Sequence, residues 1–367
     1  MSRNLYTYLL PFLFIASWWS LAFYTHNSKD SEHTITYFHP KKTLHSSHFS
    51  PLNKEELRDA LTGNWDLVAK LIHEWDIDAE LLEERGETMK RLNRREIREI
   101  YKLLRLSKEA REKTFCFFPH TYFSASLLLA LVDPQWITSL PQGFREELEI
   151  YPSSFTNRVE HDVDPFHLEY AMGEEKTLAF VAPFSHPTTL TTLEKRGAHL
   201  LSFPTPITLD ELEEEIQQVG RYTDEEERAK LLCYFIRAAR YNLENRLKID
   251  PLQPGTTCYL NARTVLSLPG EETLVGDFLK LLHLDHTVAK NSISDTPIEL
   301  EEILQKQPER VILSVRGAPL LSKESIEAFA ERNVDLYLID RELQQTVSQF
   351  SLLALFDLCS IALETGS

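Results

Sequence analysis

Residues 177–249 decide the fold, and their sequence is TLAFVAPFSHPTTLTTLEKRGAHLLSFPTPITLDELEEEIQQVGRYTDEEERAKLLCYFIRAARYNLENRLKI. Two short apolar runs, 178–182 and 199–203, each end at a proline, which is typical of buried strands that lead into loops. The segment between them is helical in pattern and stops at Gly197. The order strand, helix, strand predicts half of an α/β lobe.

The second part of this stretch predicts two consecutive helices. Residues 208–211 and 223–226 both have the form of a capping box, in which side chains accept hydrogen bonds from the first free backbone N–H groups of a helix. Gly220 stands between them as a candidate helix-ending residue. We therefore expect helices over about 209–219 and about 224–247, the second about 36 Å long, which would connect two lobes.

Composition limits the class of protein. The chain has 367 residues, enough for two α/β lobes, and its formal net charge is 39 − 56 = −17. So acidic a protein has no general basic face, which argues against nucleic acid or anionic lipid as a general partner. The cysteines form no CxxC pair, which argues against zinc or thioredoxin chemistry: Cys116, Cys233, Cys258 and Cys359.

The N-terminus predicts export. Residues 5–23 are apolar and uncharged, long enough for a membrane span. A cleaved signal peptide is the alternative, and both put the body of the protein outside the cytoplasm. We assign 1–25 to a membrane anchor or signal segment and 26–53, which is polar, to a linker.

A charged helical block follows over residues 54–113. Its apolar residues recur in three groups, which predicts three short amphipathic helices. Four arginines form a basic cluster in this acidic protein: Arg91, Arg94, Arg95 and Arg98. We interpret the cluster as a solvated helix face, with a partner or phosphate site as the alternative.

Strands and helices alternate through the rest of the chain, which predicts parallel sheets with right-handed crossovers. The fold class is thus α/β, with two Rossmann-like lobes over 114–222 and 249–367 joined by a single long rigid helix over 223–248. Expected strands lie at 114–118, 256–260, 310–314 and 336–339, and expected helices at 124–132, 273–284, 298–306, 322–332 and 347–363.

From about residue 114 to the C-terminus, the chain resembles the class III solute-binding proteins of ABC importers. The resemblance rests on four sequence segments, at 115–132, 192–201, 208–247 and 300–312. It implies two lobes that hold an iron–siderophore complex, haem or cobalamin between them and deliver it to a permease in the inner membrane. It also implies that the exposed acid Glu301 docks on that permease. No resident cofactor is implied, and the identity of any bound metal stays open.

In α/β sheets, ligands bind beyond the carboxyl ends of the strands. Aromatic rings there would stack on a flat ligand, arginines would pair with its negative groups, and histidines would coordinate iron. The alternative for each residue is a turn or core position. The candidate ligand-binding residues are His120, Tyr122, Phe184, Ser185, His186, Tyr259, Arg263 and Arg316.

The predicted function is therefore an extracytoplasmic substrate-binding protein tethered to the inner membrane. The alternative is an envelope interaction protein with the same fold and a degenerate ligand site, acting through the helical block. The sequence contains no GxSxG, HExxH, P-loop or GxGxxG motif, so we do not expect an enzyme. A two-lobed sugar-transferring enzyme is disfavoured because no nucleotide loop is recognisable.

Overall fold

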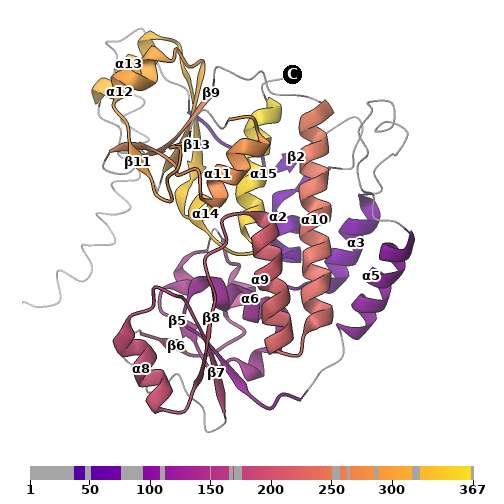
Figure 1. The fold of residues 1–367 in the computed structure, drawn as a ribbon. Helices are drawn as coiled ribbons and strands as arrows, with labels where there is room; N and C mark the ends of the chain where they lie inside the picture. Colours follow the sequence, from indigo (N-terminus) through magenta and orange to yellow (C-terminus); the bar gives the residue numbers. More distant parts are fainter. Residues whose placement is uncertain are drawn as a thin grey trace, which may run out of the picture.

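A six-stranded sheet, a three-stranded sheet, two smaller two-stranded sheets and the helices around them make up the described part of this computed structural model (Figure 1). The long helix α10 (Glu226–Ile249) runs beside the two larger sheets. The structure describes residues 37–45, 51–75, 94–107, 112–148, 150–164, 168, 176–249, 257–262, 265–284, 288–315 and 323–364.

The first sheet is parallel and three-stranded, in the order β4-β7-β8. Its strands are β4 (Cys116–Pro119), β7 (Thr177–Val181) and β8 (His199–Ser202). Parallel neighbours need a crossover, and α8 (Pro187–Lys195) supplies it between β7 and β8. The strand–helix–strand unit predicted from residues 177–203 is confirmed.

Helix α6 (Tyr122–Leu131) follows β4 and is buried along most of its length. Short elements connect it to β7. They are η1 (Pro134–Trp136), β5 (Leu140–Pro141), η2 (Phe144–Glu146), α7 (Ser153–Thr156) and β6 (Asp162–Val163), with β5 and β6 paired in parallel.

The second sheet has six strands in the order β1-β13-β12-β9-β10-β11. The first four are mutually parallel, and β10 and β11 continue the sheet in antiparallel pairing. The predicted parallel pattern holds for β9, β12 and β13, whereas β1, β10 and β11 were not predicted. The strands are β1 (Tyr37–Phe38), β13 (Asp335–Asp340), β12 (Arg310–Val315), β9 (Thr257–Ala262), β10 (Leu266–Leu268) and β11 (Thr296–Pro297).

Helices cover both faces of this second sheet. Val311 and Leu313 of β12 face one apolar cluster, while Ile312 between them faces the other, as strand alternation requires. Figure 1 shows α12 and α13 on one side and α11, α14 and α15 on the other. Their bounds are α11 (Leu274–Leu281), α12 (Leu300–Gln305), α13 (Lys323–Glu331), α14 (Arg341–Gln345) and α15 (Ser351–Glu364).

The segment predicted as a linker contributes to the fold. Strand β1 pairs in parallel with β13, and the ring of Phe38 stacks on Tyr337 with centroids 5.0 Å apart. The backbone N–H of Lys41 donates to Ser360 Oγ at 2.7 Å. A two-residue strand is too short to show a period of two, which is why the polar segment 26–53 gave no sign of it.

Helices α9 (Leu209–Tyr222) and α10 confirm the two predicted helices, but two details of the prediction were wrong. Thr208 begins α9 as expected, accepting from Glu211 N–H at 3.1 Å. Thr223 ends α9 instead of beginning α10, since its hydroxyl donates to Val219 O at 2.8 Å. Gly220 lies inside α9, where a Cβ would come within 2.4 Å of Ala229 Cβ. The absence of a side chain at Gly220 therefore allows α9 to pack closely on α10.

The described residues of the charged block form the three predicted helices: α2 (Lys54–Ala60), α3 (Trp65–Glu74) and α5 (Arg94–Leu106). They are preceded by a hairpin of β2 (Thr43–Leu44) and β3 (Leu52–Asn53). Ile100, Leu103 and Leu104 of α5 are buried in the same apolar cluster as α10. The ring of Trp75 stacks on Phe235 of α10 at 5.5 Å. The block thus shares the main core of the molecule.

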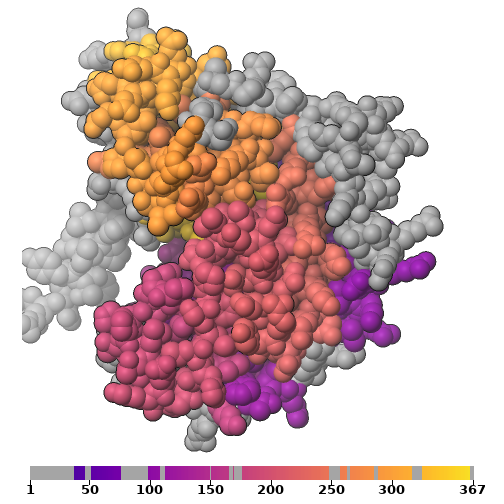
Figure 2. All heavy atoms as spheres, viewed as in Figure 1, coloured from indigo at the N-terminus to yellow at the C-terminus, as the bar shows by residue number. Residues whose placement is uncertain are grey.

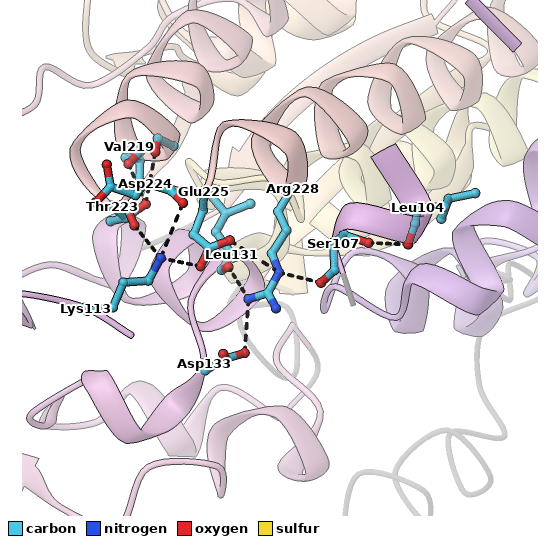
Figure 3. A network of polar contacts seen from close by, with 11 residues as sticks. Leu104, Ser107, Lys113, Leu131, Asp133, Val219, Thr223, Asp224, Glu225 and Arg228 are labelled. Carbon is cyan, nitrogen blue, oxygen red and sulfur yellow. Dashed lines mark hydrogen bonds and ion pairs between the residues drawn. The ribbon is translucent and has the colours of Figure 1, made fainter. Parts of the chain in front are cut away.

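A buried network of charges fastens the end of α5 to the start of α10 (Figure 3). Lys113 Nζ lies 2.6 Å from Glu225 Oε1 and donates to Thr223 O at 2.8 Å. Arg228 Nε lies 3.5 Å from Glu225 Oε2 and donates to Ser107 O at 2.9 Å. Arg228 also pairs with Asp133, with 3.1 Å between Nη1 and Oδ1, so the network ties three separate chain segments together.

Helix α15 is buried on every side, as its apolar sequence requires. Its Asp357 pairs with Lys54 at the start of α2, with 2.8 Å between Oδ2 and Nζ. None of the helices in the described ranges is both long and apolar enough to cross a membrane. The predicted span, 5–23, lies outside those ranges.

Candidate functional site

A cavity of about 360 Å³ lies at the carboxyl ends of β4, β7 and β8. Because the three strands are parallel, the residues that follow them meet at one edge of the sheet. Thr121–Phe123 follow β4, Ala182 and Phe184 follow β7, and residues 203–205 follow β8. This edge forms the first wall of the cavity.

The opposite wall comes from the part of the chain that follows the six-stranded sheet. Glu342 and Gln345 of α14 and the next residues, Thr346 and Val347, line it. Helix α14 begins directly after β13, because Asp340 caps it by accepting from Leu343 N–H at 2.7 Å. The cavity therefore lies between the carboxyl edge of the three-stranded sheet and the helix that follows β13 of the six-stranded sheet.

Aromatic side chains dominate the first wall. Tyr122 and Phe184 are 37% and 77% exposed, so both present ring surface to the cavity. Phe203 is buried and stacks on Phe180 of β7 with centroids 5.3 Å apart. An exposed phenylalanine beside a cavity has apolar surface that a ligand would cover.

A chain of ring contacts holds these walls in place. Tyr122 meets Phe144 edge to face at 5.4 Å, Phe144 stacks on Tyr151 at 4.2 Å, and Tyr151 meets Phe350 at 5.2 Å. Burial raises the pKa of Tyr151 above its ordinary value, so its hydroxyl stays neutral. The Tyr122 hydroxyl donates to Gln142 O at 3.0 Å. These contacts preorganise the aromatic wall.

The predicted histidines and serine lie beside the cavity lining and not within it. His120 Nδ1 lies 3.2 Å from Ser185 Oγ, which accepts from Ala182 N–H at 3.0 Å. Burial lowers the pKa of His120 and favours the neutral imidazole. His186 is exposed, and its Nδ1 accepts from Thr188 N–H at the start of α8. These residues shape the loops behind the aromatic wall.

The remaining predicted ligand residues divide into a core residue and two outside the described ranges. Tyr259 is fully buried in the sheet, where burial raises its pKa and its hydroxyl lies 3.4 Å from Asn261 Oδ1. Arg263 and Arg316 lie outside the described residues. The structure therefore brings Tyr122 and Phe184 together at the cavity, and Tyr259 is not part of its lining.

Sequence reasoning missed several residues that line the cavity: Glu147, Tyr151, Phe203, Glu342 and Gln345. The rule about carboxyl ends of strands could have found two of these positions. Phe203 follows β8, although the sequence placed it within the strand, and Glu342 follows β13. The positions of Glu147 and Tyr151 come from an irregular segment and carry no comparable signal.

The described lining residues include two carboxylates, Glu147 and Glu342, and no lysine, arginine or histidine. Within the described ranges, no three His, Cys, Asp or Glu side chains gather closely enough to hold a metal ion. All four cysteines are free thiols, three of them buried. The cavity therefore presents rings and hydrogen-bonding groups, with no thiol among its described lining residues.

Comparison with known proteins identifies a family to which part of this chain is similar. The family model described as periplasmic binding protein matches residues 179–336, from within β7 to the start of β13. The match covers less than half of the 367 residues and makes this part of the chain similar to the periplasmic binding protein family. The matched segment contains α10 and parts of both sheets. The resemblance stated from the sequence is confirmed, and members of the matching family are binding proteins, not enzymes.

Solved structures of periplasmic binding proteins are similar to this chain in fold. A possible iron-binding periplasmic solute-binding protein from Staphylococcus epidermidis has a TM-score of 0.53 and 16% identity, covering 68% of this chain and 99% of its own. The periplasmic haem-binding protein RhuT of Roseiflexus sp. RS-1 has a TM-score of 0.52 and 13% identity, with coverages of 70% and 100%.

The periplasmic haem-binding protein HutB of Vibrio cholerae is similar to the same extent, with a TM-score of 0.52, 17% identity and coverages of 67% and 98%. No curated protein matches the sequence. The coverages leave about a third of this chain without a counterpart in these structures. At such low identities, the likeness concerns the fold alone.

Proposed function

We propose that this protein is an extracytoplasmic substrate-binding protein that captures a chelated metal or corrinoid between two lobes and delivers it to an ABC permease. The ligand classes are iron–siderophore complexes, haem and cobalamin. The observation that carries the proposal is the cavity between the first sheet and α14, with Tyr122 and Phe184 exposed on its wall. Flat or bulky apolar ligands are held by such aromatic surfaces.

The family match and the fold support this function. A binding protein needs a preformed cavity with rigid walls, and the ring contacts from Tyr122 to Phe350 provide that rigidity. Helix α10 spans about 36 Å at 1.5 Å per residue, which suits a rigid spacer between lobes. Two of the similar structures are named for haem and one for possible iron binding.

The proposal includes a membrane tether and a docking residue for the permease. Residues 5–23 would hold the protein at the outer face of the inner membrane, with the body exposed to the periplasm. Glu301 would dock on the permease. It is exposed in the first turn of α12, on the part of the molecule that carries the six-stranded sheet.

A thermal-shift screen with haem, cobalamin and ferric siderophores tests the ligand. A ligand present at 100 times its Kd adds about 2.7 kcal/mol of stability. We expect one class to raise the melting temperature and the other two to leave it unchanged. Failure of all three would contradict the proposed cargo and favour an envelope interaction protein with a degenerate site.

The docking role of Glu301 has a matched control in its neighbour. Glu301→Gln should reduce ligand uptake by cells and leave ligand binding in solution unchanged. Glu302→Gln removes the same charge from the next exposed position of α12 and should leave uptake normal. Equal uptake by both variants would remove Glu301 from the proposal.

A further inference from the structure

We propose that the outer face of helix α5 docks on anionic lipid headgroups of the membrane beside which the protein is tethered. We name Arg98, Tyr101, Lys102 and Arg105 the basic face of α5. The proposal rests on the membrane tether given under the proposed function and is independent of what the cavity binds.

The basic face is a single stripe along the helix. Positions 98, 101, 102 and 105 follow the spacing i, i+3, i+4, i+7, which places them on one side of an α-helix over about 10 Å. All four side chains are exposed, and Tyr101 is 56% exposed. Arg91, Arg94 and Arg95 continue the same spacing in sequence.

The cations of this face have no carboxylate partners in the part of the chain that the structure describes. Other cations of the molecule do have partners: Lys70 pairs with Glu56, Arg145 with Asp162 and Arg240 with Glu244. This protein has a net charge of −17, yet the stripe gathers three cations that form no ion pair with any described residue. Their chemistry fits an anionic surface, which they would meet without displacing an internal partner.

The stripe is presented in a fixed orientation. The opposite side of α5 is buried against α10 through Ile100, Leu103 and Leu104. At its C-terminal end, Ser107 O accepts from Arg228 Nε in the buried network (Figure 3). Figure 1 places α5 at the edge of the molecule, away from both sheets, and in Figure 2 its purple side chains protrude there.

An anionic bilayer fits this face for two reasons. The apolar run 5–23 is expected to enter a membrane, and the short connection from residue 23 to β1 keeps the body within on the order of 50 Å of it. The exposed tyrosine among the cations suits the interface, where Tyr and Trp are enriched. Beyond a Debye length of about 8 Å the negative charge of the rest of the protein is screened, so the local stripe decides the contact.

The test is lysine footprinting of the full chain on vesicles. The protein is reconstituted with phosphatidylcholine alone or mixed with phosphatidylglycerol, recovered by flotation, treated with an amine-acetylating reagent and analysed by mass spectrometry. Each basic residue near an anionic surface contributes about 1 kcal/mol to the free energy of membrane binding, which is about fivefold in the partition coefficient. We expect Lys102 to be labelled about fivefold more slowly on the anionic vesicles, and the exposed Lys195 of α8 to be labelled equally on both.

High salt and charge-removing variants test whether protection of Lys102 is electrostatic and specific to the basic face of α5. About 1 M salt shortens the Debye length to about 3 Å and should abolish the protection. Arg98→Gln/Arg105→Gln should abolish it too, whereas Lys176→Gln/Lys195→Gln, with the same change in net charge, should retain it. Equal labelling of Lys102 on both vesicle types, or equal protection on phosphatidylcholine alone, would overturn the proposal. Flotation with phosphatidylcholine vesicles reports on the tether separately, and ligand titration reports on the cavity.

Discussion

Two groups of cationic side chains lie around helix α5, and they differ in what surrounds them. At its C-terminal end, Lys113 and Arg228 are almost completely buried, with side-chain exposures of 1% and 9%, and Glu225 lies between them. On its outer face, Arg98, Lys102 and Arg105 are exposed and meet no carboxylate among the described residues.

The difference shows how burial separates structural charges from charges available to a partner. Removing a charge from water costs several kcal/mol, so a buried cation persists only where a counter-ion and carbonyl groups surround it. Lys113 has Glu225 and the carbonyl oxygens of Thr223 and Asp224. An exposed cation remains hydrated, needs no partner within the chain and is free to meet one outside it.

The largest expected effect comes from breaking the buried group. Glu225→Ala leaves Lys113 and Arg228 without their shared carboxylate, and breaking a buried ion pair on one side costs about 3–5 kcal/mol. Urea denaturation of the variant should show a loss of this size in the free energy of unfolding. Glu214→Ala removes an exposed glutamate of α9 and should change it by less than about 0.5 kcal/mol. Equal losses in the two variants would show that the network is not structural.

A third charged pair, between Lys54 and Asp357, differs from both groups because only part of its hydrogen-bonding capacity is satisfied. One carboxylate oxygen of Asp357 pairs with Lys54, while the other is buried with no hydrogen-bond partner among the described residues. Burial raises the pKa of Asp357 from 3.8 to about 6. The folded state therefore binds this proton more tightly than the unfolded state.

The sign of the pH dependence follows from that shift. Stabilisation by the bound proton is present below about pH 4, is lost as the pH rises to about 6 and is absent above it. Relative to Asp357→Asn, the wild type should thus lose on the order of 3 kcal/mol of unfolding free energy between these pH values. Denaturation curves across this range measure the difference, with Asp335→Asn, at an exposed carboxyl, as the control for the lost charge. A difference independent of pH would contradict this assignment.

The smallest expected effect is on the outer face of α5. Arg98→Gln/Arg105→Gln removes two exposed cations that form no ion pair within the described chain, so the free energy of unfolding should change by less than about 0.5 kcal/mol. Denaturation in the absence of lipid measures it. A loss above about 1 kcal/mol would mean that these arginines stabilise the fold and would end the contrast with the buried network.

The sequence was sufficient to predict most of the alternating strands and helices, because their apolar residues recur at regular spacing and prolines or glycines end many of the segments. Residues 178–182 and 310–314 are apolar runs with definite ends, and both correspond to strands with parallel neighbours. Thr223 and Gly220 were misassigned for a tertiary reason. The close approach of Gly220 to Ala229 depends on two helices packing, which a local capping pattern does not contain.

The site was predictable only where it follows a strand. Tyr122 and Phe184 come directly after β4 and β7, so topology alone placed them at the cavity. Tyr151 reaches it through contacts with Phe144 and Phe350, residues far apart in the sequence. Tyr259, within a strand buried on both faces, could not be distinguished by sequence from a strand-end residue.

Ligand binding in the cavity is tested by titration of matched aromatic variants. Haem, cobalamin and a ferric siderophore are each titrated into the wild type, Phe184→Ala in the cavity and Tyr101→Ala on α5, which removes an exposed ring elsewhere. We expect one ligand class to bind the wild type. Loss of the stacking ring should weaken that binding by about 0.5–1.5 kcal/mol, or roughly two- to tenfold, while Tyr101→Ala binds like wild type. Binding by Phe184→Ala as tight as that of the wild type, or no binding by any protein, would contradict this expectation.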